Sequence, residues 1–300
     1  MIIESFADLR GVLTSPDISK ATGPDGIFAR MLKHTADSIT PIITSIFNQS
    51  ITTGTVPDQW KLSLVVPIHK LGDMANPSNY RPISLLPIVS KVLEQHSANK
   101  LQSVLSISNQ QWGFMPGRST TGAILSAIHE WHGNLDKGAD VQAVFFDLQK
   151  AFDSVPLILL IDKYISLNVH TTLISWISSY LYNRKQQVGV SGVNSVPVSV
   201  TSGVPQGSVL GPLLFLIYVD SLTSIPLSGG SLVLFADDIL LYKVVYCFEN
   251  YLALQEDVHS LANWISNQNL TLNVCKCKSL LVSRKHSYLC SQPKVMALSK

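Results

Sequence analysis

The chain has 300 residues, of which 46% are hydrophobic and 14% are charged. This apolar content excludes general disorder, which requires low hydrophobicity and high net charge, and the length suits one large domain or two to three smaller ones. The formal net charge of +2 is too small to identify a partner by itself.

The first half of the chain is predicted to begin with a turn-rich loop and a helix. The loop, Lys20–Ile27, contains three residues that break regular structure. Apolar residues at helical spacing then predict a helix over Ser38–Thr53 that ends at Gly54. The elements expected next are strands at Leu62–Ile68 and Arg81–Leu86, joined as a hairpin by residues 72–79, and helices at Pro87–Val104 and Ser119–Leu135.

The second half opens with Val141–Asp147, an almost continuous apolar run that is typical of a strand buried in a sheet. The elements expected after it are helices at Leu157–Leu167 and Thr171–Leu181, paired strands at Gln186–Ser191 and Val196–Thr201, a helix at Ser208–Leu222, strands on both sides of Asp237–Asp238, a helix at Asn250–Asn267, and short strands at Thr271–Val274 and Ser279–Ser283. Pro212 has to lie in the first turns of its helix to be tolerated. Strands separated by helices predict the α+β class, a mixed α and β fold.

No zinc site and no membrane span are indicated. The four cysteines, Cys247, Cys275, Cys277 and Cys290, lack a paired C-x-x-C spacing. We interpret them as reduced thiols of an intracellular protein, in the nucleus or the cytoplasm. The longest apolar run, Val209–Val219, is too short to span a bilayer, so no membrane partner is expected.

Two adjacent aspartates, Asp237 and Asp238, lie between the apolar runs VLFA and ILLY. The pattern predicts a hairpin with both acids at its turn, where the alternation of side chains relaxes and both carboxylates can reach one region. Burying two anions without a partner is very costly, and the flanking ten residues supply only one cation, Lys243. A bound divalent metal ion explains the pair, although an ordinary Asp-rich turn explains a bare pair equally well.

A third aspartate, Asp147, ends the apolar strand AVFF, 90 residues before the pair. Two strands that both end in acids can be neighbours, which would place three carboxylates at one rim of a sheet. Such hard oxygen ligands select Mg²⁺ or Mn²⁺, and two such ions can activate an attacking hydroxyl and stabilise a leaving phosphate oxygen. Basic residues concentrate in 61–120 and 261–300, which fits a cleft for a polyanion or ordinary solvated charge.

Several longer strings occur in a fixed order along most of the chain. They are KATGPDGI (Lys20–Ile27), VPIHKLGD (Val66–Asp73) with NYRPISLLP (Asn79–Pro87), GFMPGRST (Gly113–Thr120), FFDLQKAFDSV (Phe145–Val155), SGVPQGSVLGPLLF (Ser202–Phe215), FADD (Phe235–Asp238) and LTLNVCKCKSLLVS (Leu270–Ser283). Together they resemble the sequence boxes of reverse transcriptases from non-LTR (LINE-like) retrotransposons. The resemblance covers roughly Lys20 to Ser283, and its order leaves little room for chance.

The resemblance implies a right-hand polymerase fold and RNA-templated DNA synthesis. Such an enzyme adds dNTPs to the 3′-hydroxyl of a DNA primer on an RNA template and uses two Mg²⁺ or Mn²⁺ ions. Asp147 and Asp237 match the principal metal ligands, and Asp238 matches the adjacent supporting residue. The backbone carbonyl of Leu148, directly after Asp147, is near enough to serve as a further ligand.

Three residues match family positions that hold the phosphates and sugar of the incoming nucleotide. Lys70 and Arg81 match the fingers positions that grip the triphosphate, a role for which cations are required. Phe152 matches the steric gate, a flat ring that clashes with a 2′-hydroxyl and favours dNTPs. A solvated hairpin and a core aromatic are the plain structural alternatives.

Three further residues match the pocket wall and the leaving-group side. Gln206 and Gly207 match the wall over base and template, where glycine lets the backbone approach the nucleotide closely. Lys276 matches a lysine that protonates the pyrophosphate leaving group. Simple phosphate contact, shared with Lys278, is the alternative for Lys276.

By the same resemblance, residues 1–60 are expected to form an N-terminal helical extension of the fingers, 61–140 the fingers and 141–283 the palm. Residues 284–300 would be the start of a thumb or a truncated tail. Because the chain ends soon after the last box, we expect the thumb to be largely missing. Residues 1–19 are too few for an endonuclease domain.

Met115 departs from the family pattern, which usually has Arg at this position. This substitution keeps open a second hypothesis, a catalytically inactive, decayed or domesticated remnant that only binds nucleic acid. An intron maturase or a telomerase-like relative would need an additional RNA-binding segment, and no such segment is apparent in the sequence.

Overall fold

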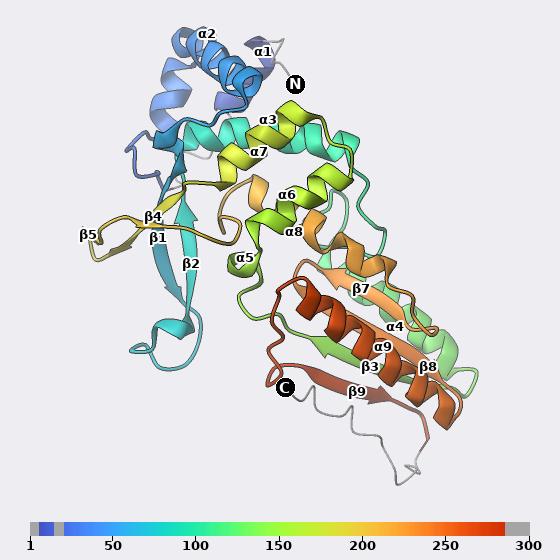
Figure 1. The fold of residues 1–300 in the computed structure, drawn as a ribbon. Coiled ribbons are helices and arrows are strands. Elements are labelled where there is room, and N and C mark those ends of the chain that lie inside the picture. The colour runs from blue at the N-terminus through green and yellow to red at the C-terminus, as the bar shows by residue number, and fades with distance from the viewer. Residues whose placement is uncertain (1–5, 15–20, 286–300) are drawn as a thin grey trace. The chain divides into compact units, whose positions relative to one another are not determined.

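The computed structural model describes residues 6–14 and 21–285, and Figure 1 shows its elements. By compactness the chain divides into two units, each built from two stretches of sequence. The first unit runs to Ser106 and resumes at Pro156–Leu214, and the second comprises Ile107–Val155 and the residues from Phe215 onward. The mixed α and β class predicted from the sequence is confirmed. No helix in the described ranges has the length and apolar character that crossing a membrane requires.

The first unit combines helices with a small sheet. Its helices are α1 (Phe6–Thr14), α2 (Ala29–Thr53), α3 (Ile88–Val104), α6 (Leu157–Ser166), α7 (Thr171–Leu181) and the start of α8 (Leu210–Val219), with short 3-10 turns η1 (Asp58–Lys61) and η2 (Pro77–Asn79). Its strands are β1 (Leu62–His69), β2 (Tyr80–Leu85), β4 (Lys185–Val190), β5 (Val193–Asn194) and β6 (Val198–Ser199). The sheet has the order β2-β1-β4-β5, and β6 also pairs with β4.

Helix α2 ends where the sequence predicted, and it begins earlier. Gly54 adopts a left-handed conformation with φ of 66°, and the Thr55 amide donates to the Ser50 carbonyl at 2.9 Å, which closes the C-terminus. The helix starts at Ala29 and carries Pro41 in its interior. Buried residues keep helical spacing from Ala29 onward, so packing of this stripe offsets the hydrogen bond that Pro41 removes.

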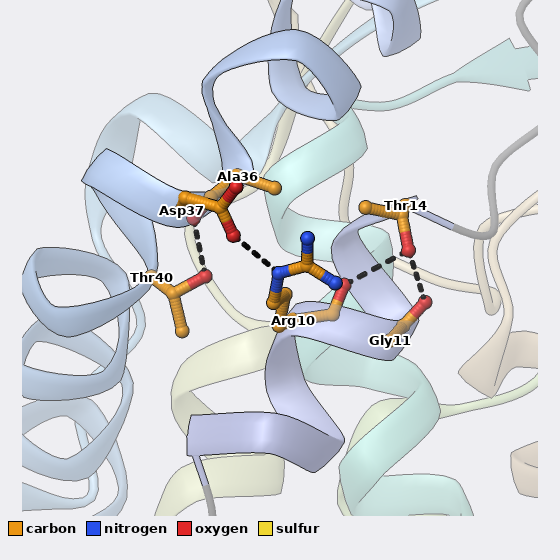
Figure 2. A network of polar contacts seen from close by, with 6 residues as sticks. All are labelled: Arg10, Gly11, Thr14, Ala36, Asp37 and Thr40. Atoms are coloured by element: carbon orange, nitrogen blue, oxygen red, sulfur yellow. Dashed lines mark hydrogen bonds and ion pairs between the residues drawn. The ribbon is translucent and has the colours of Figure 1, made fainter.

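Helix α1 packs against α2, and Figure 2 shows the polar contacts between and within them. Arg10 Nε donates to Asp37 Oδ1, and this hydrogen bond holds the pKa of the Asp37 carboxyl below its ordinary value. Thr14 Oγ1 donates to the Arg10 carbonyl at 3.1 Å, and Thr40 Oγ1 donates to the Ala36 carbonyl at 2.6 Å. Both charged side chains are exposed, so the ion pair orients α1 on α2 more than it stabilises the fold.

The hairpin of β1 and β2 is the one predicted, with antiparallel register from Leu64↔Leu85 to His69↔Tyr80. The strand pairing after β4 is tighter than predicted. Ser191 and Gly192 both have positive φ and form a two-residue turn, so β5 pairs with β4 at once. The expected partner at Val196–Thr201 is reduced to β6, which also pairs with β4.

The second unit is an antiparallel sheet with helices packed on it. Its elements are α4 (Thr120–Leu135), β3 (Asp140–Phe146), α5 (Ala151–Ser154), the rest of α8, η3 (Asp220–Ser224), β7 (Ser231–Phe235), β8 (Asp238–Val245), α9 (Phe248–Asn267) and β9 (Lys278–Val282). The strand order is β7-β8-β3-β9, and all the pairings are antiparallel. The strand expected at Thr271–Val274 is only an isolated bridge, formed by Leu272 with Leu148.

Helices α4 and α9 explain why β3 is apolar along almost its whole length. Ala127 of α4 packs with Val141, Ala143 and Tyr242 on one face of the sheet. Because side chains alternate along a strand, Leu241 of β8 points to the other face, and α9 packs against β8 (Figure 1). A strand covered on both faces needs apolar residues at successive positions, as the sequence predicted.

Candidate active site

The hairpin of β7 and β8 presents the aspartate pair. Phe235 pairs with Asp238, so Ala236 and Asp237 form a two-residue turn. Ala236 has φ of 57°, a left-handed conformation that such turns require and that glycine normally supplies. Asp237 is half-buried at this turn and Asp238 is exposed, so both acids lie at the end of the hairpin as predicted.

Asp147 comes to the same edge of the sheet. Strand β3 pairs with β8 up to Phe146 and Ile239, and one further step in this register sets Asp147 opposite Asp238. The expectation that the two acid-ended strands are neighbours is therefore confirmed. Asp147 is half-buried, and its backbone carbonyl accepts a hydrogen bond from the Asn273 amide at 2.8 Å.

The carboxylates of this edge supply the hard oxygen donors that Mg²⁺ prefers. Among residues 6–14 and 21–285, no group of three or more His, Cys, Asp or Glu side chains is arranged to hold a metal ion. Lys243, the cation nearest in sequence, does not serve the aspartate pair. Its Nζ is buried and donates to the Ser228 carbonyl, in the loop before β7. Lys243 is therefore committed to that loop.

Leu148 is buried and lies in the bridge with Leu272. The bridge is closed by the Asp147 carbonyl and by the Gln149 amide, which donates to the Thr271 carbonyl at 2.8 Å. These two bonds do not use the Leu148 carbonyl, so the pairing is compatible with Leu148 as a backbone ligand.

Phe152, on α5, is held in an aromatic stack. Its ring lies parallel to that of Phe215, with centroids 4.5 Å apart, and edge-on to that of Phe114, with centroids 6.2 Å apart. Phe215 is fully buried and Phe114 is largely exposed. Phe114 also has a positive φ of 54°, an uncommon backbone conformation for a residue other than glycine.

Lys276 is exposed in a turn between the Leu272 bridge and β9. Its amide donates to the Asn273 carbonyl at 2.9 Å, and the Asn273 amide in turn bonds to Asp147. The backbone of this turn is thus tied to the Asp147 edge, in the same unit as the three aspartates.

Lys70 and Arg81 lie on the β1–β2 hairpin of the first unit. The Lys70 amide donates to the Asn79 carbonyl at 2.9 Å, which extends the ladder one step beyond β1. Asn79 and Arg81 are two residues apart, so Lys70 and Arg81 lie on the same face of the hairpin as diagonal neighbours. Both are exposed, which suits cations that bind phosphates.

Gln206 and Gly207 lie against the same hairpin. The Ser84 amide donates to the Gln206 carbonyl at 2.7 Å. Gly207 has φ of 112°, and a Cβ at this position would lie 2.6 Å from the Ser84 carbonyl oxygen. Only glycine fits so close to β2, so packing against β2 is itself a reason for glycine at this position.

The sequence interpretation missed two buried polar residues that hold these loops. Glu94 of α3 is 1% exposed, and its Oε2 accepts from the amides of Val209 and Leu210 at the start of α8. Gln111 is also 1% exposed, and its Oε1 accepts from the Ala236 amide at 2.9 Å. An acid within a predicted helix was the only signal for Glu94, and a polar residue two positions before the GFMPGRST string was the only one for Gln111.

Carboxylates lie at one edge of an antiparallel sheet, and the stacked ring of Phe152 lies in the same unit. Metal-dependent phosphoryl transfer uses carboxylates arranged in this way. The family described as reverse transcriptase (RNA-dependent DNA polymerase) matches residues 68–292. The chain belongs to this family.

Relatives place it with the LINE-like, non-LTR members. The chain is 32% identical over 284 residues to the probable RNA-directed DNA polymerase from transposon BS of Drosophila melanogaster. The aligned region covers 88% of this chain and 31% of that relative. It is 31% identical over 283 residues to the corresponding protein from transposon X-element, covering 91% of this chain and 31% of that relative. The RNA-directed DNA polymerase from the mobile element jockey is 26% identical, over 94% of this chain and 32% of that relative.

The fold has a solved counterpart. An apo telomerase from Candida tropicalis, truncated from its C-terminal domain, matches with a TM-score of 0.52 over 81% of this chain and 56% of that chain. The identity is 12%, so the likeness concerns the fold, which is the right-hand polymerase fold expected from the sequence. The chain spans about a third of the length of the transposon relatives that it matches.

Proposed function

We propose that this chain is the polymerase core of a LINE-like retrotransposon, which adds dNTPs to the 3′-hydroxyl of a DNA primer on an RNA template. The observation that carries the proposal is the pairing of β3 with β8, because it brings Asp147 beside the Asp237–Asp238 turn. Within this proposal residues 61–140 act as fingers and 141–283 as palm, with 1–60 extending the fingers. Residues 286–300, most of the tail assigned to a thumb, lie outside the described residues.

Asp147 and Asp237 are the principal Mg²⁺ ligands of this proposal, with Asp238 and the Leu148 carbonyl in support. When bound, two such ions activate the primer hydroxyl and neutralise the charge that develops on the phosphates. Mg²⁺ is commonly held by one or two carboxylates together with substrate phosphates and water. An edge with few carboxylates, lacking a complete protein cage, fits that mode of binding.

Three cationic side chains serve the triphosphate in this proposal. Lys70 and Arg81, on one face of their hairpin, bind the phosphates as they arrive, and the planar guanidinium suits two-point contact with phosphate oxygens. Lys276 donates a proton to the pyrophosphate oxygen that leaves. Its support is the backbone link from its turn through Asn273 to Asp147.

Phe152, Gln206 and Gly207 select and shape the nucleotide. The Phe152 ring can exclude a 2′-hydroxyl only if the ring stays in place. Stacking on Phe215 holds it there. Gly207 keeps the backbone of the proposed pocket wall close to β2.

The test is primer extension on poly(rA)/oligo(dT) with and without Mg²⁺, using this chain and two asparagine variants. Asp237→Asn should lower extension by about a hundredfold or more, since an amide lacks the anionic oxygen that would hold Mg²⁺ and orient the reacting groups. Asp136→Asn, an exposed aspartate of the same unit, should extend like the wild type. Equal extension by Asp237→Asn would remove the metal-ligand assignment. A wild-type chain that binds the template and extends no primer would favour the remnant that only binds nucleic acid.

A further inference from the structure

The turn that carries Asp237 depends on support from outside its own hairpin. Ala236 holds a left-handed backbone conformation that costs an L-residue free energy, so the turn persists only if its surroundings fix it. The two strands pair up to Phe235 and Asp238, which leaves the Ala236 amide outside the ladder. That amide bonds to Gln111 Oε1.

Gln111 reaches the turn from a segment 125 residues away in the sequence. Its Oε1 accepts from the amides of both Gly113 and Ala236 at 2.9 Å, so one oxygen joins the two chains. Its Nε2 has no partner among the described residues, so the acceptor oxygen is the end of this side chain that the fold uses.

Backbone bonds hold the same segment along β7. The Trp112 amide donates to the Leu234 carbonyl at 2.7 Å, and the Leu234 amide donates to the Gln110 carbonyl at 2.9 Å. A Cβ on Gly113 would lie 2.4 Å from the Ala236 nitrogen, so the two backbones touch directly. Residues 110–113 therefore lie along the end of β7, joined to it by a single parallel bridge between Gln111 and Leu234, and reach the Ala236–Asp237 turn.

Arg118 in turn fixes this segment. Its guanidinium donates to the Asn109 carbonyl at 2.9 Å and to Asn109 Oδ1 at 2.8 Å, and it lies 5.7 Å from the Trp112 ring centroid. The Ser108 amide is held by Asp220 Oδ1 at 2.9 Å. Arg118 is therefore an internal brace of the loop and contributes little to the basic surface suggested by the sequence.

We propose that Gln111 is a positioning residue, which holds the backbone of the Ala236–Asp237 turn and thereby aims the Asp237 carboxylate. The inference rests on the proposed function for its catalytic consequence. Mg²⁺ demands near-ideal geometry, and a reacting group has to be held within about 0.5 Å of its productive place. Without the hydrogen bond to Gln111, the turn would let the Asp237 carboxylate move over a wider range of positions, while the sheet stays folded.

The test compares Gln111→Met with Gln142→Met. Both replace a buried glutamine of the same unit, and Gln142 bonds to Ser279 Oγ at 2.6 Å, away from the turn. Amide hydrogen exchange at Ala236 should quicken by about fivefold or more in Gln111→Met only, the factor set by one hydrogen bond. The kcat of extension should fall about tenfold to a hundredfold with little change in KM for dNTP, and the Mg²⁺ midpoint should rise.

A matched fall of Tm in both variants, with Ala236 exchange and the Mg²⁺ midpoint unchanged in Gln111→Met, would overturn the proposal. Gln111→Glu keeps an acceptor oxygen and should restore slow exchange at Ala236. Gln111→Glu also serves as the second variant if Gln111→Met does not fold. Fast exchange at Ala236 in Gln111→Glu would contradict the proposal. Exchange and Mn²⁺ binding followed by electron paramagnetic resonance need no polymerisation. An inactive wild-type chain would therefore contradict the proposed function. Amide exchange and Mn²⁺ binding would still show whether Gln111 positions the turn.

Discussion

The ring of Phe152 lies on the ring of Phe215, with centroids 4.5 Å apart and planes inclined by 15°. Phe215 is fully buried, so the half-buried Phe152 rests on a surface that cannot move aside. Phe114 contacts Phe152 in an edge-on arrangement, with centroids 6.2 Å apart. A ring fixed in this way has the stiffness that a gate against a 2′-hydroxyl requires.

Phe152→Val should therefore admit rNTPs. Removing the ring leaves room for the 2′-hydroxyl, and the ratio of rNTP to dNTP incorporation should rise by about tenfold to a hundredfold, the range that pocket fit commonly provides. Single-nucleotide incorporation measures kcat/KM for each substrate. Phe248→Val, an exposed position at the start of α9, is the control. An unchanged ratio in Phe152→Val would show that this ring is only part of the core.

Gly207→Ala tests the pocket wall. The added Cβ would meet the Ser84 carbonyl oxygen at 2.6 Å, and φ of 112° is unfavourable for alanine, so the loop has to move away from β2. We expect KM for dNTP to rise by about tenfold. Gly133→Ala, a helical glycine with no atom within 4 Å of the new Cβ, should leave KM unchanged. A wild-type KM in Gly207→Ala would exclude this loop from nucleotide binding.

The elements that the sequence predicted are those fixed by local chemistry. The apolar runs around Asp237 and Asp238 specified a hairpin, and Gly54 ended α2 because a left-handed residue closes a helix. The early start of α2 was missed because proline is normally tolerated only in the first turn of a helix, a restriction at Pro41 that packing overrides. The tight turn at Ser191 was missed because serine rarely adopts positive φ.

Part of the candidate site could also be predicted, because local sequence patterns fix it. Asp147 could be placed beside the pair because both lie at strand ends, and strands have few possible neighbours. Gln111 could not be found in this way, because its contact with Ala236 joins positions that no local pattern links. Arg118 was counted only among the basic residues of 61–120, because its sequence position does not reveal that it donates to backbone carbonyls.

Asp257→Ala tests the loop before β7. Asp257 is 1% exposed, and its carboxylate accepts from the amides of Ser228 at 2.6 Å and Gly230 at 3.2 Å. Alanine would leave both amides without this acceptor, which should lower the free energy of unfolding by about 2–3 kcal/mol. Urea denaturation gives the value. The exposed neighbour Glu256→Ala should change it by less than about 0.5 kcal/mol, and a similarly small effect at Asp257 would contradict the role assigned to it.

Glu94 gives a prediction about pH. Its carboxylate is buried at the start of α8, and burial raises its pKa above the ordinary value of 4.5, opposed by the charge of Arg184 and by hydrogen bonds from the Leu210 and Val209 amides and from Ser90. Above pH 4.5 the unfolded chain therefore loses this proton before the folded chain does. The folded state then binds more protons, so stability falls as pH rises until the raised pKa is passed.

Glu94→Gln removes this titration and keeps an oxygen that can accept from the Val209 and Leu210 amides. The Tm of the variant minus that of the wild type should therefore increase between about pH 4 and pH 7, because only the wild type loses stability from this group over that range. Thermal unfolding at a series of pH values measures the difference, in which groups common to both proteins cancel. A difference that decreases with pH would mean that Arg184 outweighs burial and that Glu94 is held ionised as the partner of a buried ion pair.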